Sequence, residues 1–222
     1  MALLQDLANK AKTKNSRILL PEWTDPRVIE ASRLITDQNL AQIVLFDENA
    51  ASSLGVSSIN LKNEDLRLEY AQTLFELRKH KGVTLESALE MLSSPSVSAM
   101  VALHRSEVDG VVTGAITPSQ EVLSSALKII GVSQESSLVS SLFLMVFDEN
   151  HKNYGENLIF TDCAMNISPS ADELAEIACS AYETAQSFLD EDPKLAMLSF
   201  STNQSAKHSE VDKVRQATEI VK

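Results

Sequence analysis

The sequence predicts an α/β protein with two domains, residues 1–134 and 135–222, each built around a mostly parallel sheet. Short runs that are apolar throughout alternate with amphipathic helical segments, which is typical of parallel strands covered on both faces. The strand character then changes near residues 131–136, where a longer and partly alternating segment begins. A chain of 222 residues can bury a sizeable core as one or two domains.

The first predicted domain follows an alternating helix–strand order. Residues 17–20 are apolar and end at Pro21, whereas Asp25 and Pro26 fit the N-cap and the first position of a helix. We expect, in order, a short helix over 3–8, a strand over 17–20, a helix from 26, a strand over 42–46, an irregular stretch over 50–63, helices over 64–79, from 85 and over 97–104, a strand over 108–113 and a helix through 130.

The second predicted domain opens with a strand inside residues 136–147. A polar loop over 148–157 separates it from a strand over 158–162. Ser170 and Glu173 form a capping-box pattern at the start of a long helix. A last strand over 194–200 and a last helix from 207 complete the predicted order.

The charge balance excludes two classes of partner. The formal net charge of −12 argues against nucleic acid and against an anionic membrane surface. No apolar run approaches the roughly 20 residues needed to span a bilayer, and nothing resembles a signal peptide, so we expect a cytoplasmic protein. An anionic metabolite would need a locally basic pocket in so acidic a chain, which makes individual arginines informative.

The cysteines and histidines indicate neither a disulfide framework nor a metal site. The chain has two cysteines, Cys163 and Cys179, and its four histidines share no metal-ligand spacing. A thiol nucleophile at Cys163 would need a basic partner, and no histidine lies in an obvious position to serve as one. We therefore expect Cys163 to be a buried structural cysteine.

The segment from Val108 to Ile130 is predicted to form a strand, a turn at Thr113-Gly114-Ala115 and a helix that begins near Pro118. The first N–H groups of such a helix have no partner within the helix, and anionic ligands bind there in parallel α/β sheets. The alternative is an ordinary strand-to-helix turn without a ligand.

Other predicted segment ends also carry polar residues. Residues 199–207 combine hydroxyl groups with Lys207 and could form a phosphate cradle or a plain hydroxyl-capped turn. Arg78 lies in a basic cluster over residues 77–82, where a cation either meets an anionic ligand or offsets the helix dipole. Glu22 and Asp162 could contact a ligand or cap the turns that follow them.

Six stretches, in order and over almost the whole chain, resemble the phosphate acetyltransferase (phosphotransacetylase) family. These are residues 17–22 with Asp25 and Arg27, residues 77–82, residues 108–115 with 126–130, residues 143–146, residues 160–166 with Pro169, and residues 196–202 with 205–207.

This resemblance implies a fold like that of isocitrate and isopropylmalate dehydrogenases, with the active site in a cleft between domains. It implies transfer of an acetyl group between coenzyme A and inorganic phosphate, by direct attack of the coenzyme A thiolate in a ternary complex. It also implies that an aspartate deprotonates the thiol and that arginines hold the phosphate. The resemblance further implies no metal or cofactor, with acetyl-CoA and phosphate or acetyl phosphate as substrates, and a homodimer.

The family pattern also suggests which residues bind substrate. The matching positions are Arg78, Thr113, Gly114, Thr117, Asp162, Ser201, Thr202, Ser205 and Lys207. The family's base and its Ser-Arg motif correspond to positions beyond Lys222, which leaves the catalytic residues unassigned and the C-terminal part of the fold absent. Ser124 and Ser125 stand where the family usually has arginine and proline, and Asn203-Gln204 replaces a common Lys-Gly.

Two alternative functions remain open at this point. One is a phosphate acyltransferase for a longer acyl group such as butyryl. The other is a non-catalytic binding or oligomerisation subunit of the same fold.

Overall fold

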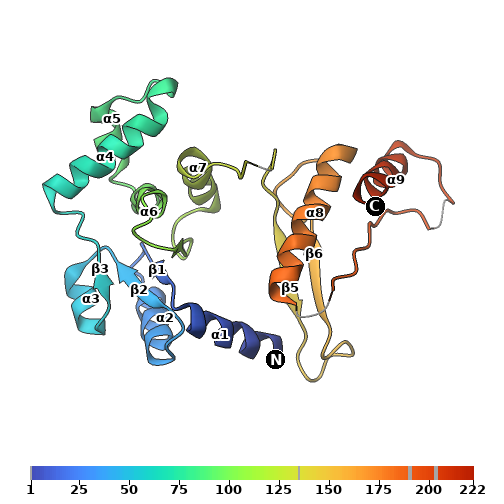
Figure 1. Cartoon of the computed structure of the whole chain (residues 1–222), viewed down its shortest axis with the longest axis horizontal. Coiled ribbons are helices and arrows are strands. Elements are labelled where there is room, and N and C mark those ends of the chain that lie inside the picture. Colours follow the sequence, from blue (N-terminus) through green and yellow to red (C-terminus); the bar gives the residue numbers. More distant parts are fainter. Residues whose placement is uncertain (1, 135, 190–191, 203–204) are drawn as a thin grey trace. The chain divides into compact units, whose positions relative to one another are not determined.

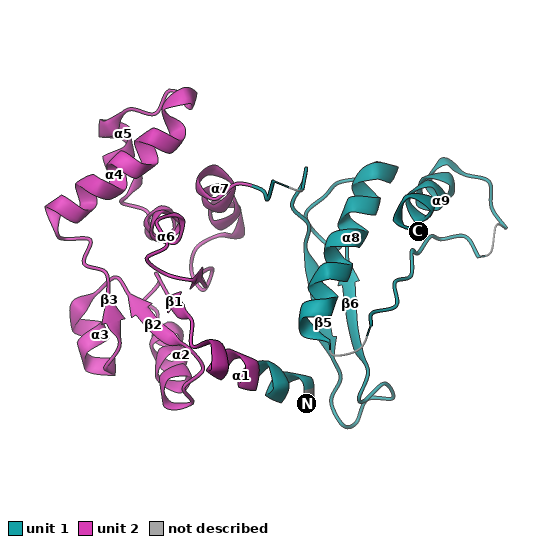
Figure 2. Ribbon diagram, in the orientation of Figure 1, with its two compact units in different colours: residues 1–7, 132–222 teal, residues 8–131 magenta. Residues whose placement is uncertain are grey.

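The computed structural model describes residues 2–134, 136–189, 192–202 and 205–222 (Figure 1). It divides into two compact units: unit 1 comprises Met1–Leu7 and Val132–Lys222, and unit 2 comprises Ala8–Gly131 (Figure 2). The predicted domain boundaries, 1–134 and 135–222, stay a prediction.

Unit 2 contains a four-stranded sheet in the order β3-β2-β1-β4, and every neighbouring pair is parallel. In the register, Ile18 of β1 lies between Ile43 of β2 and Gly110 of β4. The strands are β1 (Arg17–Leu19), β2 (Gln42–Leu45), β3 (Ser57–Ser58) and β4 (Gly110–Val111). The prediction of a parallel sheet is thus confirmed for this unit.

Helices cover both faces of that sheet, because successive strand residues point to opposite sides. Leu19 and Val44 pack with Tyr70 and Leu74 of α4, whereas Ile43 and its neighbours pack in a second cluster. The helices are α1 (Ala2–Lys14, which both units share), α2 (Pro26–Asp37), α3 (Glu48–Leu54), α4 (Glu64–Arg78), the 3₁₀ turn η1 (Lys79–Lys81), α5 (Leu85–Met91), α6 (Pro95–His104) and α7 (Ser119–Ile129).

The predicted irregular stretch over 50–63 is wrong in part. The Asp47 side chain accepts a hydrogen bond from Ala50 N–H and starts α3, and Gly55 ends this helix in the left-handed conformation. The strand β3 follows directly. A seven-residue helix spans about two turns, which is too short for the apolar periodicity on which the prediction relied. Likewise α6 begins at Pro95, two residues before the helix predicted over 97–104, because Ser94 caps it.

Unit 1 contains a two-stranded antiparallel sheet, β5 (Leu142–Val146) and β6 (Asn157–Thr161), with Phe143 opposite Phe160. Two helices, α8 (Ala171–Phe188) and α9 (Ser209–Val221), pack against each other. Ser170 and Glu173 make both hydrogen bonds of a capping box, as predicted. The strand β5 is shorter than the predicted segment.

The predicted strand over 194–200 is wrong, because these residues belong to no strand. Leu198 is 83% exposed and Phe200 69% exposed. Within the described part of unit 1, β5 and β6 pair only with each other, so this extended segment has no ladder partner. Among the described helices none is both long and apolar enough to cross a membrane.

Candidate functional site

The loop between β4 and α7 is held by a carboxylate from the neighbouring strand. Glu22, which follows β1, accepts hydrogen bonds from four successive backbone N–H groups. Oε2 accepts from Gly114 at 2.8 Å and Ala115 at 2.7 Å, and Oε1 accepts from Ile116 at 3.0 Å and Thr117 at 2.7 Å. The anion bound by this loop is therefore the chain's own carboxylate.

Glu22 is only 4% exposed, which makes its charge state informative. Burial alone would raise the pKa of the Glu22 carboxyl, but hydrogen bonds from the Thr117 hydroxyl and from the loop N–H groups outweigh it and lower the pKa to about 2. Glu22 is therefore a permanent anion at neutral pH.

This arrangement corrects the expectation that the turn leaves its N–H groups unpaired for an anionic ligand. Glu22 occupies the donors of Gly114 to Thr117. Glu22 does cap a turn, but one that begins 92 residues further along the chain. A single sequence carries no signal for that partnership, because it depends on β1 and β4 being neighbours in the sheet.

The same loop also engages Arg27. Its Nη2 donates to the Ala115 carbonyl at 2.7 Å, and Asp25 holds the guanidinium through both carboxylate oxygens, at 3.0 Å and 2.8 Å. The pKa of Asp25 falls to about 2, mainly through the Arg27 side-chain hydrogen bond. By contrast the Thr113 hydroxyl is buried and has no hydrogen-bond partner in the described structure. Thr113 thus carries a buried side-chain hydroxyl that is not used within the described structure.

Arg78 ends α4, and the following residues form the 3₁₀ turn up to Gly82, which is left-handed. The chain has seven arginines, and within the described residues Arg78 alone among them has a side chain that makes no hydrogen bond or ion pair. Its position at the helix C-terminus fits an interaction with the helix dipole. Because this half-buried residue has no side-chain partner, its guanidinium is available to an anion.

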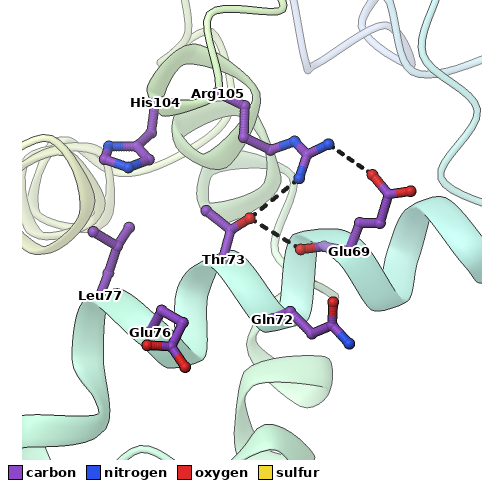
Figure 3. Close-up of a pocket in the computed structure, with 7 residues that line it drawn as sticks. All are labelled: Glu69, Gln72, Thr73, Glu76, Leu77, His104 and Arg105. Carbon is purple, nitrogen blue, oxygen red and sulfur yellow. Dashed lines mark hydrogen bonds and ion pairs between the residues drawn. The ribbon is translucent and has the colours of Figure 1, made fainter.

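A cavity of about 460 Å³ lies between α4 and α6 (Figure 3). Its polar groups largely satisfy one another, because Arg105 donates to Glu69 at 2.7 Å, to Thr73 at 3.2 Å and to Glu107 at 2.6 Å. The lining residues are Glu69, Gln72, Thr73, Glu76, Leu77, His104 and Arg105. None of them is a predicted site residue, and we assign this cavity a structural role.

Behind that cavity, the buried Tyr70 hydroxyl donates to Glu107. Burial, followed by the Glu107 carboxylate, raises the pKa of Tyr70. The Arg105 guanidinium lies 5.3 Å from the Tyr70 ring centre. These contacts join α4 to the end of α6.

In unit 1 the predicted site residues lie in two loops. Asp162 follows β6 in the left-handed conformation, with φ of 55°. In the second loop the Ser201 hydroxyl lies 3.3 Å from that of Ser205 and accepts from Ala206 N–H at 3.0 Å, and Ser205 N–H donates to the Thr202 carbonyl. His208, rather than any predicted residue, caps α9.

The predicted substrate-binding residues are thus divided between the units. Arg78, Thr113, Gly114 and Thr117 belong to unit 2; Asp162, Ser201, Thr202, Ser205 and Lys207 belong to unit 1. The structure places Ser205 in contact with Ser201 and Thr202, and it places Thr113, Gly114 and Thr117 in one loop. Asn203 and Gln204 lie outside the described residues.

The expectation that Cys163 is buried is wrong, because both cysteines are exposed free thiols. Cys163 lies in the bend after β6, where its Sγ is 3.6 Å from the Ser141 carbonyl oxygen. Among the described residues, no group of three or more His, Cys, Asp or Glu side chains could hold a metal ion.

Comparison with known proteins gives one consistent result. Residues 2–222 match the family model described as phosphate acetyl/butaryl transferase. The phosphate acetyltransferase of Thermoanaerobacterium thermosaccharolyticum is 40% identical over all of this chain, and that of Clostridium acetobutylicum is 38% identical. The match covers 70% of either relative.

Solved structures agree with this assignment. A phosphotransacetylase from Streptococcus pyogenes has a TM-score of 0.87 and 37% identity, covering 99% of this chain and 68% of that one. The EutD phosphotransacetylase from Staphylococcus aureus has a TM-score of 0.85 and 33% identity, covering 99% and 67%. This chain therefore belongs to the phosphate acetyl/butaryl transferase family.

Proposed function

We propose that this chain is a phosphate acetyltransferase, which transfers an acetyl group between coenzyme A and inorganic phosphate. The observation that carries the proposal is its identity of 40% to a phosphate acetyltransferase over its whole length, together with a family match over residues 2–222. The fold and the loops after β4 and before α9 provide the setting for this chemistry.

The reaction exchanges one acyl bond for another. In the direction of acetyl-CoA formation, the coenzyme A thiol loses its proton and attacks the carbonyl carbon of acetyl phosphate. A C–S bond forms, the C–O bond to phosphate breaks, and phosphate leaves with its electron pair. Negative charge develops on the carbonyl oxygen and on the phosphate, so positioning and positively charged donors are what the protein must supply.

Arg78 is the group in unit 2 best placed to supply positive charge. Its guanidinium makes no hydrogen bond or ion pair within the described residues, and the chain as a whole carries a net charge of −12. A planar guanidinium can hold two phosphate oxygens at once. We propose that Arg78 contacts the phosphate group of a substrate.

We further propose two hydroxyl-bearing loops as substrate contacts. The first contains Thr113, Gly114 and Thr117, and the buried, unpartnered Thr113 hydroxyl supports it. The second contains Ser201, Thr202, Ser205 and Lys207, with Asp162 in the loop after β6. The adjacent Ser201 and Ser205 hydroxyls support this second loop. The catalytic base remains unassigned.

We also propose a homodimer located in the cytoplasm. The outward-facing pair Phe143 and Phe160, each more than half exposed, supports a partner surface on unit 1. The free, exposed thiols Cys163 and Cys179 fit a reducing compartment. Light scattering after size-exclusion chromatography measures the oligomeric state.

A thiol-release assay tests the proposed reaction. Purified chain is mixed with acetyl-CoA and phosphate, and free thiol is followed over time, with butyryl-CoA in a parallel reaction. We expect release that depends on phosphate and is faster with acetyl-CoA. Release with butyryl-CoA alone would replace the acetyl assignment with a longer acyl group. Coenzyme A binding by calorimetry without any turnover would instead indicate a non-catalytic subunit.

A further inference from the structure

The loop that carries Thr113, Gly114 and Thr117 has no helix or strand of its own, yet its backbone is tied at several successive positions. All of these ties come from residues 22–27, the segment after β1. The segment after β1 therefore determines the shape of the proposed substrate loop.

We propose that Glu22 is a positioning residue, which replaces a ligand anion in the β4–α7 loop and fixes the loop for substrate binding. The inference rests on the proposed function for its kinetic consequence, whereas its structural consequence can be tested without any turnover.

The Glu22 carboxylate is saturated with donors from the loop. An ionised carboxylate has about four acceptor directions. The four backbone N–H groups of Gly114 to Thr117, two on each oxygen at 2.7–3.0 Å, and the Thr117 hydroxyl together occupy them. Glu22 therefore has no acceptor left for a substrate. Its influence on substrate must pass through the loop, which distinguishes it from a catalytic residue.

Residues 22–27 hold both the N–H groups and a carbonyl group of the loop backbone. Glu22 takes N–H groups, and Arg27 donates to the Ala115 carbonyl at 2.7 Å. Arg27 is itself fixed by Asp25. Gly114 has φ of 105°, a conformation that favours glycine, so the loop adopts a shape that it would leave readily without these ties. Residues 22–27 therefore act as a two-sided clamp.

Thr113 is the residue whose position the clamp affects most directly. It precedes the clamped residues directly, and its buried hydroxyl has no partner within the described structure. A buried hydroxyl without a partner is costly, which is tolerated where a ligand completes it. Because Glu22 holds the backbone of residues 114–117 in place, it also restricts the backbone of the adjacent Thr113.

Glu22→Gln tests the clamp, with Asp47→Asn as a matched control. Asp47 is also a nearly buried carboxylate (8% exposed) at the end of a strand in the same sheet, but it caps α3. The Gln amide keeps one acceptor oxygen. Its N–H₂ group replaces the other oxygen and faces two backbone N–H donors, so those two hydrogen bonds are lost. Glu22→Asp keeps the charge on a side chain that is one methylene shorter and serves as a second variant.

Hydrogen exchange by mass spectrometry gives the readout that needs no activity. We expect peptides containing residues 113–117 to exchange at least tenfold faster in Glu22→Gln than in the native chain, and to be unchanged in Asp47→Asn. Unchanged exchange in Glu22→Gln would overturn the proposal. An equal rise in both variants would also overturn it, because that outcome indicates general destabilisation.

Chemical rescue adds a sharper test. Glu22→Ala leaves the four N–H donors facing a space that a small carboxylate can enter. We expect formate, against chloride at equal ionic strength, to restore exchange protection at residues 113–117, whereas Asp47→Ala should not respond there. Failure of formate to restore any protection would count against an anion-organised loop.

Kinetics then separates positioning from folding. In Glu22→Gln we expect the KM for phosphate to rise and kcat/KM to fall by at least tenfold, with Asp47→Asn unchanged. A native chain without turnover would reject the proposed function and leave the exchange experiments as the test of the clamp. A native chain with turnover and a Glu22→Gln variant with native kcat/KM would reject the positioning role.

Discussion

The carboxylate of Glu22 and the backbone N–H of Thr117 lie 2.7 Å apart, although 95 positions separate them in the sequence. They meet because β1 and β4 are parallel neighbours whose C-terminal ends share one edge of the sheet. This edge is where anionic ligands bind in many α/β proteins. Here an internal carboxylate satisfies the loop donors, so side chains rather than these amides are left to contact substrate.

Glu22 should make the stability of unit 2 depend on acid. Its pKa in the folded chain is about 2, below the ordinary value of 4.5, so its contribution is complete above pH 4.5 and is lost as pH falls toward 2. The shift corresponds to about 3 kcal/mol at neutral pH. We therefore expect Glu22→Gln to lower the free energy of unfolding by about 3 kcal/mol at pH 7.

Urea unfolding followed by Trp23 fluorescence measures this effect, because Trp23 is the chain's one tryptophan and lies next to Glu22. The native chain also contains Asp25 and Asp109, whose pKa values fall to about 2 through their arginine partners, so acid weakens several contacts together. The difference in free energy of unfolding between the native chain and Glu22→Gln should shrink below pH 4.5. A difference that stays constant down to pH 2 would contradict the assignment of charge to Glu22.

Arg78→Ala should weaken substrate binding. A hydrogen bond between two charged groups contributes about 1.5–3 kcal/mol, which predicts a fall in kcat/KM of about 10- to 100-fold with a raised KM for phosphate. The control is Arg33→Ala, because Arg33 is exposed and pairs with Glu30 on the surface of α2. Unchanged KM and kcat in Arg78→Ala would reject its proposed role.

The sequence was most informative where local chemistry is sufficient. Asp25 with Pro26, and Ser170 with Glu173, start helices as predicted, because caps depend on residues within a few positions. The strands at 17–19 and 42–45 were predicted from their apolar character. Residues 194–200 have the same character, yet form no strand, because a strand also needs a partner that local sequence does not specify.

The candidate site was less predictable for the same reason. The sequence pointed to the Thr113–Gly114 turn and to Arg78, but it could not identify Glu22 as the partner of the turn. That partnership depends on which strands are neighbours, and on burial of a charge that ordinarily remains on the surface. The sequence also led to the wrong prediction that Cys163 is buried, because burial depends on how β6 and the bend that follows it pack.

Tyr70→Phe should cost about 1 kcal/mol of stability, because it removes the hydroxyl that donates to Glu107 while keeping the buried ring. Glu107 keeps its ion pair with Arg105, which limits the loss. For a chain of this size we expect a fall in Tm of about 2–4 °C. The exposed Tyr154→Phe is the control and should change Tm little. Equal Tm values for the Tyr70 variant and the native chain would show that the hydroxyl contributes nothing.

Gly114→Ala should alter both stability and the substrate loop. Gly114 has φ of 105°, and an added Cβ would meet nothing within 4 Å, so the cost is backbone strain rather than a clash. Such strain costs about 1–3 kcal/mol, and the loop can relieve it by releasing its N–H groups from Glu22. We expect kcat/KM to fall about tenfold.

Gly155→Ala is the matched control, because Gly155 also has a positive φ, 89°, with open space at its Cβ, but lies between β5 and β6. Both variants should lose stability by a similar amount, measured by urea unfolding. Faster hydrogen exchange at residues 113–117 should accompany the Gly114 variant alone. If both variants lose stability and neither changes exchange or kcat/KM, the conformation of Gly114 matters for folding and not for the substrate loop.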